Sequence, residues 1–300
     1  MDAAPEALFA GLATLDVVHR VDRLPAPDEK VRALSQELVA GGPAANAAVT
    51  YAALGGRATL LTALGTHPLA RLVAEELAER AVEVVDLDPA AVTPPAVAAC
   101  TVVTTSGERT VSSVGAADSG VPAPAPLNLG QARLVVLDGH HPQVALAAAH
   151  AARASEVPVL LDAGSWKPVH AELLPLVTVA VPGAAYRPPG DDGDVLAGLV
   201  AAGVKHAAVT AGAGPVRWRS RTGGTGSVTV PRVPALDTLG AGDVFHGALA
   251  WALARRPEAA FPAALALAAE IAAMRCSFAG QRTWLTSPRL SEVRTQWLSS

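Results

Sequence analysis

The chain contains the run Asp237-Thr238-Leu239-Gly240-Ala241-Gly242-Asp243, and an apolar stretch over 244–253 follows it directly. The apolar stretch predicts a helix, and the glycines before it let the backbone approach a ligand closely. Because the first amides of a helix have no partner within the helix, they can bind an anion such as phosphate. An aspartate inside this turn would lie next to the bound anion. A glycine-rich turn with a capping aspartate is also a common structural device, so the run alone leaves both interpretations open.

Short apolar strands alternate with helices in the second half of the chain. Strands are predicted at 134–137, 157–161, 177–181 and 206–210, and a helix is predicted at 145–154. Strands that are apolar throughout indicate a parallel sheet covered by helices on both faces, which is an α/β three-layer sandwich. In such a sheet ligands bind beyond the carboxyl ends of the strands, where Asp138, Asp162 and the loop at Gly212 fall.

Strands with alternating polar and apolar residues are concentrated in the first third of the chain. A strand is predicted at 31–39, and the segments 97–104 and 109–114 flank Ser106-Gly107-Glu108 as a hairpin. We expect segments within about 16–40 and 97–114 to form a small β-sheet lid over the ligand crevice. No linker long enough to separate independent domains is evident, so residues 1–300 are expected to form a single domain.

Composition excludes several classes of protein. The 300 residues are 51% apolar and 17% charged, which excludes a disordered chain. A net charge of −4 argues against a nucleic-acid partner, and no apolar run reaches the ~20 residues of a membrane span. The acidic start of the chain does not resemble a signal peptide, and Cys100 and Cys276 form no motif. We therefore expect a soluble cytoplasmic protein.

Two runs of the sequence together resemble the motifs of one enzyme family. The run 237–243 and the run Gly41-Gly42-Pro43-Ala44-Ala45-Asn46-Ala47 are similar to the two signatures of the ribokinase-like (PfkB) carbohydrate kinases, in the same order. The resemblance covers nearly the whole chain. It implies a ribokinase-like fold and a kinase that transfers a phosphoryl group from ATP, with Mg²⁺, to a hydroxyl of a small sugar. A hydroxymethyl group is the expected acceptor.

The resemblance assigns roles at the site of transfer. Asp243 is implied as the catalytic base, and the amides of Gly240, Ala241 and Gly242 are implied as the anion hole. The helix dipole is expected to keep Asp243 ionised at neutral pH. Asp237 resembles the residue that helps to form a monovalent-cation site, for K⁺, in some members, and helix capping is the alternative for it.

Further residues are candidates for the two substrates. The expected sugar-binding residues are Asp16, Asp28, Gly42, Asn46 and Arg109. The expected ATP-binding residues are Thr210, Gly212, Gly214 and Lys167. For Arg109 the alternative is a surface arginine, and for Lys167 it is a solvated lysine. Asn46 is a mediocre helix former among alanines, which indicates a polar contact directed at the crevice.

The sequence also departs from the family pattern. Many members carry Asn-x-x-Glu near position 180, where this chain has Pro182-Gly183-Ala184-Ala185-Tyr186, so the organisation of Mg²⁺ must differ here. Gly65-Thr66-His67 replaces the usual Gly-Asp-Asp. The segment 15–18 resembles the ketohexokinase branch, and the run around Pro43 resembles sulfofructose-kinase-type sequences.

The sequence is also compatible with two alternative functions. The missing Asn-x-x-Glu is compatible with a sugar-binding regulator built on an inactive kinase scaffold, whereas the intact run 237–243 favours an enzyme. A nucleoside kinase would need an apolar or aromatic slot for the base, and the aromatic content of 4% favours a sugar. Because a lid of alternating strands exposes an edge, a homodimer formed through the lid is expected.

Overall fold

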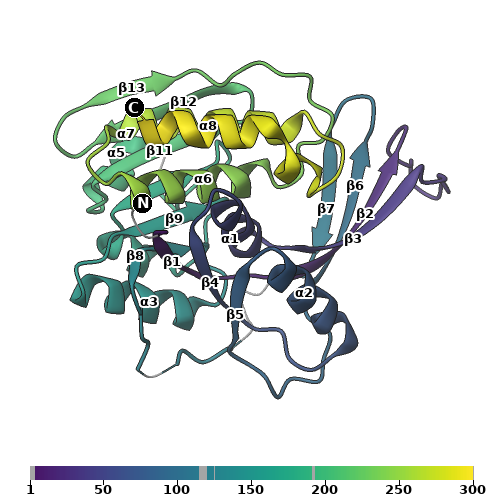
Figure 1. The fold of residues 1–300 in the computed structure, drawn as a ribbon, viewed down its shortest axis with the longest axis horizontal. Helices are drawn as coiled ribbons and strands as arrows, with labels where there is room; N and C mark the ends of the chain where they lie inside the picture. The colour runs from purple at the N-terminus through teal and green to yellow at the C-terminus, as the bar shows by residue number, and fades with distance from the viewer. Residues whose placement is uncertain (1–3, 115–119, 125, 191–192, 300) are drawn as a thin grey trace.

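The centre of the molecule is a nine-stranded sheet in the order β13-β12-β11-β10-β9-β8-β1-β4-β5 (Figure 1). The computed structural model describes residues 4–114, 120–124, 126–190 and 193–299. The strands are β1 (Glu6–Ala10), β4 (Arg57–Thr62), β5 (Val82–Asp86), β8 (Ala132–Leu137), β9 (Val159–Ala163), β10 (Val179–Pro182), β11 (His206–Ala211), β12 (Gly214–Ser220) and β13 (Thr225–Val228). From β5 to β11 neighbouring strands pair in parallel, and β12 and β13 add antiparallel strands at one edge.

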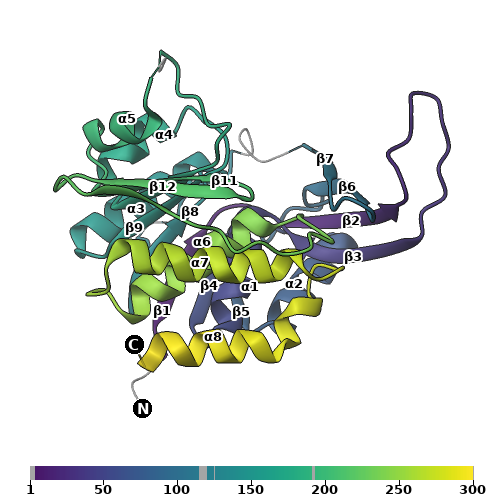
Figure 2. The ribbon, with the colours of Figure 1, turned by 90° about the horizontal axis from the view of Figure 1, so that it is seen from above.

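Helices cover both faces of this sheet, which confirms the three-layer α/β arrangement (Figure 2). One face carries α1 (Pro43–Ala53), α2 (Pro68–Glu79), α6 (Ala241–Arg255), α7 (Phe261–Cys276) and α8 (Pro288–Ser299). The other face carries α3 (Pro142–Ala154), α4 (His170–Leu173), η1 (Leu174–Leu176) and α5 (Val195–Ala201). Strands such as β9 are buried at every position because apolar side chains are needed on both faces. Within the described ranges, none of the helices has the length and apolarity that a membrane span requires.

A second sheet of four strands lies beside the main one, in the order β3-β2-β6-β7, and we call it the flap. Its strands are β2 (Thr14–Val21), β3 (Ser35–Gly41), β6 (Val97–Val103) and β7 (Arg109–Ser113). β2 and β6 pair in parallel, while the β2–β3 and β6–β7 pairs are antiparallel. β3 begins four residues later than the predicted strand at 31–39. The flap strands overlap both segments expected for the lid, but β2 begins at Thr14 and β3 ends at Gly41, outside the expected range 16–40.

The inner face of the flap packs against the run that precedes α6. Val18, Val39 and Cys100 form a small buried cluster with Leu239, which is the residue before Gly240. The flap is thus in direct contact with the glycine-rich start of α6.

Candidate active site

The predicted helix start at Gly240 is present in the structure. Gly240 is the N-cap of α6 and has a φ of 74°, a left-handed conformation that glycine adopts without strain. Gly242 is exposed, so its backbone is open to a ligand. The amide of Ala241 donates to the carbonyl of Thr238 at 3.3 Å, which closes the turn. The first turn of α6 therefore presents the amide-rich surface that an anion requires.

Asp243 lies in the first turn of α6 and is half-buried. Its Oδ2 accepts a hydrogen bond of 2.8 Å from Nδ2 of Asn46 on α1. Burial, together with the negative charge of Asp162, raises the pKa of Asp243 to about 7, although the Asn46 hydrogen bond acts in the opposite direction. The helix dipole therefore keeps only part of the Asp243 population ionised at neutral pH. Loss of hydration outweighs the dipole.

The di-glycine before α1 is needed for close packing at the site. A Cβ on Gly41 would lie 2.2 Å from the carboxylate of Asp16 on β2. Gly42 has a φ of 93°, and a Cβ there would lie 2.3 Å from the carbonyl oxygen of Leu12. Asp16 is buried, and burial raises its pKa while a hydrogen bond from Thr14 lowers it. The two glycines thus let α1 begin directly against the Asp16 carboxylate.

Asn46 uses both ends of its amide on protein groups. Its Nδ2 donates to Asp243, and its Oδ1 accepts a 3.0 Å hydrogen bond from Nη1 of Arg282. Arg282 in turn donates from Nε to Glu76 at 2.8 Å. No motif surrounds Arg282 in the sequence, so the sequence alone does not identify it as a site residue. Asn46 therefore connects α1, α6 and the segment that follows α7.

Asp237 is fully buried and is contacted by two arginines. Its Oδ2 lies 2.9 Å from Nη1 of Arg20 on β2 and 3.2 Å from Nη2 of Arg275 at the end of α7. Its Oδ1 accepts a hydrogen bond of 2.9 Å from the amide of Leu239. The sequence carried one signal for Arg275, because it is a single charge within the otherwise apolar stretch 271–276. In this structure the Asp237 carboxylate is thus paired with guanidinium groups.

The flap also contacts the run 237–243 through hydrogen bonds to Thr238. Arg109 on β7 donates to Oγ1 of Thr238 at 3.1 Å, and Thr238 donates to the carbonyl of Gly107 at 2.8 Å. Arg109 thus lies at the junction of the flap and the helix start. Asp28, by contrast, is exposed in the β2–β3 loop, which extends away from the body of the molecule (Figure 2).

Two carboxylates from strand ends complete the crevice. Asp138 follows β8, is buried, and accepts hydrogen bonds from the amides of Leu12 at 2.8 Å and Ala44 at 3.2 Å. Asp162 is the fourth residue of β9, and its Oδ2 lies 3.1 Å from Nδ1 of His246 on α6. Asp138 fixes the start of α1, whereas Asp162 lies near the transfer site.

The residues expected to bind ATP lie near the carboxyl ends of β9 and β11. Thr210 forms a parallel β-bridge with Gly183. Gly212 has a φ of 58° and lies in the turn between β11 and β12. Gly214 begins β12. Lys167 is half-buried, and within the described part of the chain its ammonium group has no hydrogen-bond or ion-pair partner.

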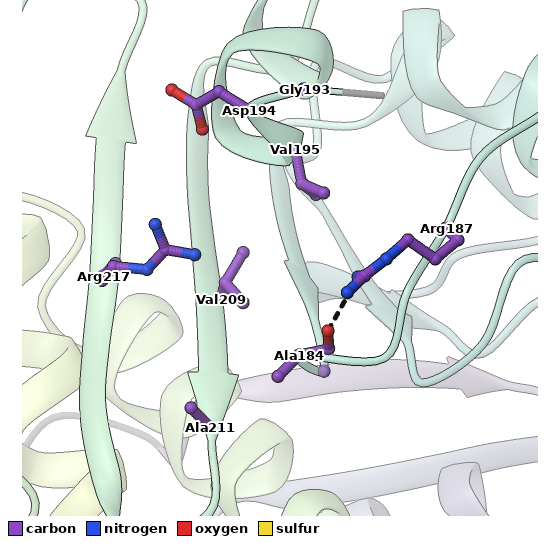
Figure 3. Close-up of a pocket in the computed structure, with 9 residues that line it drawn as sticks. Ala184, Arg187, Gly193, Asp194, Val195, Val209, Ala211 and Arg217 are labelled. Carbon is purple, nitrogen blue, oxygen red and sulfur yellow. Dashed lines mark hydrogen bonds between the residues drawn. The ribbon is translucent and has the colours of Figure 1, made fainter. Parts of the chain in front are cut away.

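A cavity of about 680 Å³ opens beside the end of β11 (Figure 3). Gly183 and Ala184 line it at the position of the missing Asn-x-x-Glu, together with Val209 and Ala211 on β11. Arg187 and Arg217 point into it from opposite sides (Figure 3). Nη1 of Arg187 also donates to the carbonyl of Ala184 at 2.8 Å. Two guanidinium groups facing one cavity favour an anionic ligand.

Comparisons with known proteins identify a matching family and several similar structures. Residues 5–287 match the pfkB family carbohydrate kinase. A candidate ribokinase from Agrobacterium tumefaciens is 28% identical over 99% of this chain and 100% of its own, with a TM-score of 0.84. A ribokinase from Thermotoga maritima shares the fold, with 20% identity over 98% of this chain and 99% of its own and a TM-score of 0.79. A ribokinase from Arabidopsis thaliana also shares it, with 23% identity over 99% of each chain and a TM-score of 0.75. The Arabidopsis structure contains ribose and ATP.

Proposed function

Because the chain belongs to the pfkB family of carbohydrate kinases, we propose that it transfers the γ-phosphoryl group of ATP to a hydroxyl, expected to be a hydroxymethyl, of a small sugar. The fold that it shares with a ribokinase structure containing ribose and ATP supports this proposal. The observation that carries it is the first turn of α6, where Asp243 lies directly after the backbone of Gly240, Ala241 and Gly242.

In this proposal Asp243 takes the proton from the attacking hydroxyl. A pKa near 7 suits a general base at neutral pH, because it combines a large ionised fraction with useful basicity. The amides of Gly240, Ala241 and Gly242 bind the transferring group and stabilise its negative charge. ATP supplies the phosphoryl group and leaves as ADP, and bound Mg²⁺ would neutralise the negative charge of the phosphates. Asn46 holds the Asp243 carboxylate in one orientation through the 2.8 Å hydrogen bond.

The residues around the crevice fit a nucleotide with Mg²⁺. Lys167, Arg187 and Arg217 offer positive charge for phosphates, and Thr210, Gly212 and Gly214 lie at the adjoining strand ends. Among the described residues no cluster of three or more His, Cys, Asp or Glu offers a ready-made metal site. Mg²⁺ is commonly held by one or two carboxylates together with substrate phosphates, and Asp162, whose charge acts on Asp243, is the carboxylate that would take this role.

The sugar is proposed to lie between the flap and α1. The buried carboxylate of Asp16 can accept hydrogen bonds from sugar hydroxyls, next to the backbone of Gly42. Arg109 borders this space from β7. Asn46 positions Asp243 with one hydrogen of its Nδ2, and the second hydrogen of that NH₂ group is a donor that a sugar hydroxyl can accept. Asp28 is not included, because it lies in the exposed loop.

A coupled assay for ADP release over a panel of pentoses, hexoses, ketoses and nucleosides tests the proposed function. We expect turnover with a sugar, and Asp243→Asn should lower kcat at least about 10²-fold while the protein stays folded. If a sugar raises the melting temperature but nothing is turned over, the chain is a sugar-binding regulator. If only nucleosides are phosphorylated, the sugar assignment is wrong.

We also propose that two copies associate through the flap. β3 and β7 are the edge strands of the four-stranded sheet. Leu38 on β3 and Leu34, which directly precedes β3, are 53% and 58% exposed. An unpaired edge with exposed apolar residues favours strand pairing with another copy. Sedimentation velocity should show a dimer that Leu38→Lys converts to a monomer. A monomeric wild type at micromolar concentration would contradict the proposal.

A further inference from the structure

Arg275 carries a buried cation directly behind the anion hole. Its side chain is fully buried at the end of α7, and both terminal nitrogens face oxygen atoms. Nη2 contacts Leu239 O at 2.9 Å, Asp237 Oδ2 at 3.2 Å and Gln281 Oε1 at 3.3 Å. Nη1 contacts Phe278 O at 3.1 Å and Asp237 O at 3.3 Å. We call these five oxygen atoms the oxygen cluster.

The oxygen cluster surrounds the two terminal nitrogens of one guanidinium, and oxygen atoms are the ligands that a hard cation such as K⁺ takes. The resemblance implied that Asp237 takes part in a monovalent-cation site, yet here the guanidinium of Arg275 already lies against its carboxylate and its carbonyl. A metal ion bound to the same oxygens would overlap the guanidinium and repel it. The residues of this chain therefore do not fit a dissociable cation at this position.

The oxygen cluster is connected to the anion hole through one peptide bond. The carbonyl of Leu239 and the amide of Gly240 belong to the same planar trans peptide, so they point in opposite directions. Nη2 of Arg275 donates to the carbonyl of Leu239 at 2.9 Å. The amide of the same residue, Leu239, donates to Oδ1 of Asp237 at 2.9 Å, so both backbone groups of Leu239 are held in place. The Arg275 contact therefore sets the direction in which the Gly240 amide points.

We propose that Arg275 is a built-in replacement for a monovalent cation and the positioning residue of the anion hole. This inference rests on the role proposed above for the amides of Gly240–Gly242. It has two consequences. Catalysis by the intact protein does not depend on K⁺ or Na⁺, and removal of the guanidinium opens an oxygen-lined site that a small cation can enter.

The first consequence is tested on the wild-type protein. Sugar phosphorylation is measured at constant Mg²⁺ in about 100 mM tetramethylammonium chloride and in KCl of the same concentration, which matches ionic strength. We expect kcat to differ by less than about twofold. Activation by K⁺ of about fivefold or more would overturn the inference. Turnover that requires K⁺ refutes only this inference, whereas failure to phosphorylate any sugar refutes the proposed function.

The second consequence is tested with Arg275→Ala, and Arg289→Ala on α8 serves as the control because Arg289 is an exposed surface residue. Arg275→Ala should lower kcat at least about tenfold. Addition of about 50 mM K⁺ or guanidinium should restore activity with saturation and raise the melting temperature, whereas tetramethylammonium should not. The melting measurement needs no substrate. If neither K⁺ nor guanidinium changes activity or melting temperature, the oxygen cluster binds no cation and the proposal fails.

Discussion

The pKa of Asp243 predicts how the specificity constant of the enzyme depends on pH. Burial raises this pKa to about 7, and Asp162 adds to the increase. A general base must be ionised to accept a proton, and kcat/KM reports the ionisation of the free enzyme. We therefore expect kcat/KM for the sugar to fall as pH drops below 7 and to level off above it.

The magnitude follows from the fraction of Asp243 that is ionised. With a pKa of about 7, the ionised fraction is about one tenth at pH 6 and about nine tenths at pH 8, so kcat/KM should rise by about tenfold over this range. A carboxylate at its ordinary value of 3.8 would be ionised throughout, and kcat/KM would then be flat.

Two substitutions of neighbouring residues separate this titration from that of the nucleotide. Asp162→Asn removes a negative charge that raises the Asp243 pKa, so the acid limb should move to lower pH. Asn46→Ala removes a hydrogen bond that lowers this pKa, so the limb should move to higher pH. The ionisation of free ATP cannot respond to either change.

The assay is ADP release at subsaturating sugar from pH 5 to pH 9, with circular dichroism at each pH to verify that the variants are folded. A profile that is flat between pH 6 and pH 8 would refute the reasoning about burial. A limb that stays in place in both variants would show that another group titrates.

Three further predictions concern stability and nucleotide binding. Gly42→Ala should lower the free energy of unfolding, measured in urea, by about 2 kcal/mol or more, because the new Cβ adds backbone strain and clashes with Leu12. The control is Gly223→Ala, because Gly223 also has a positive φ but has open space around it. The loss in the control should be smaller. Folded Asp243 binds more protons than the unfolded residue between pH 3.8 and about 7, so this group's contribution to stability is lost as pH rises through 7. Asp243→Asn should therefore raise the melting temperature relative to wild type more at pH 8 than at pH 5, and equal differences at both pH values would contradict this. Lys167→Met should raise the KM for ATP by about tenfold, with the KM for the sugar within about twofold, and an unchanged KM for ATP would identify Lys167 as a solvated residue.

The family and the layered fold were predictable from the sequence alone. Gly240 and Gly42 mark the two motifs because positive φ angles restrict the residue type at a single position. The strands at 134–137 and 157–161 were visible because a parallel sheet with both faces covered requires apolar side chains at every position. These are local requirements, and local residue patterns report them.

Only the tertiary structure decided how the charged residues of the site are partnered. Asn46 and Asp243 are 197 positions apart, and Arg20 and Asp237 are 217 apart, so no pattern in the sequence relates them. The raised pKa of Asp243 depends on burial and on the charge of Asp162, which the folded chain brings near. The oxygen cluster around Arg275 likewise combines the segments 237–239 and 278–281. Motifs recur because each is short and continuous, whereas electrostatic partners are set by how distant segments pack.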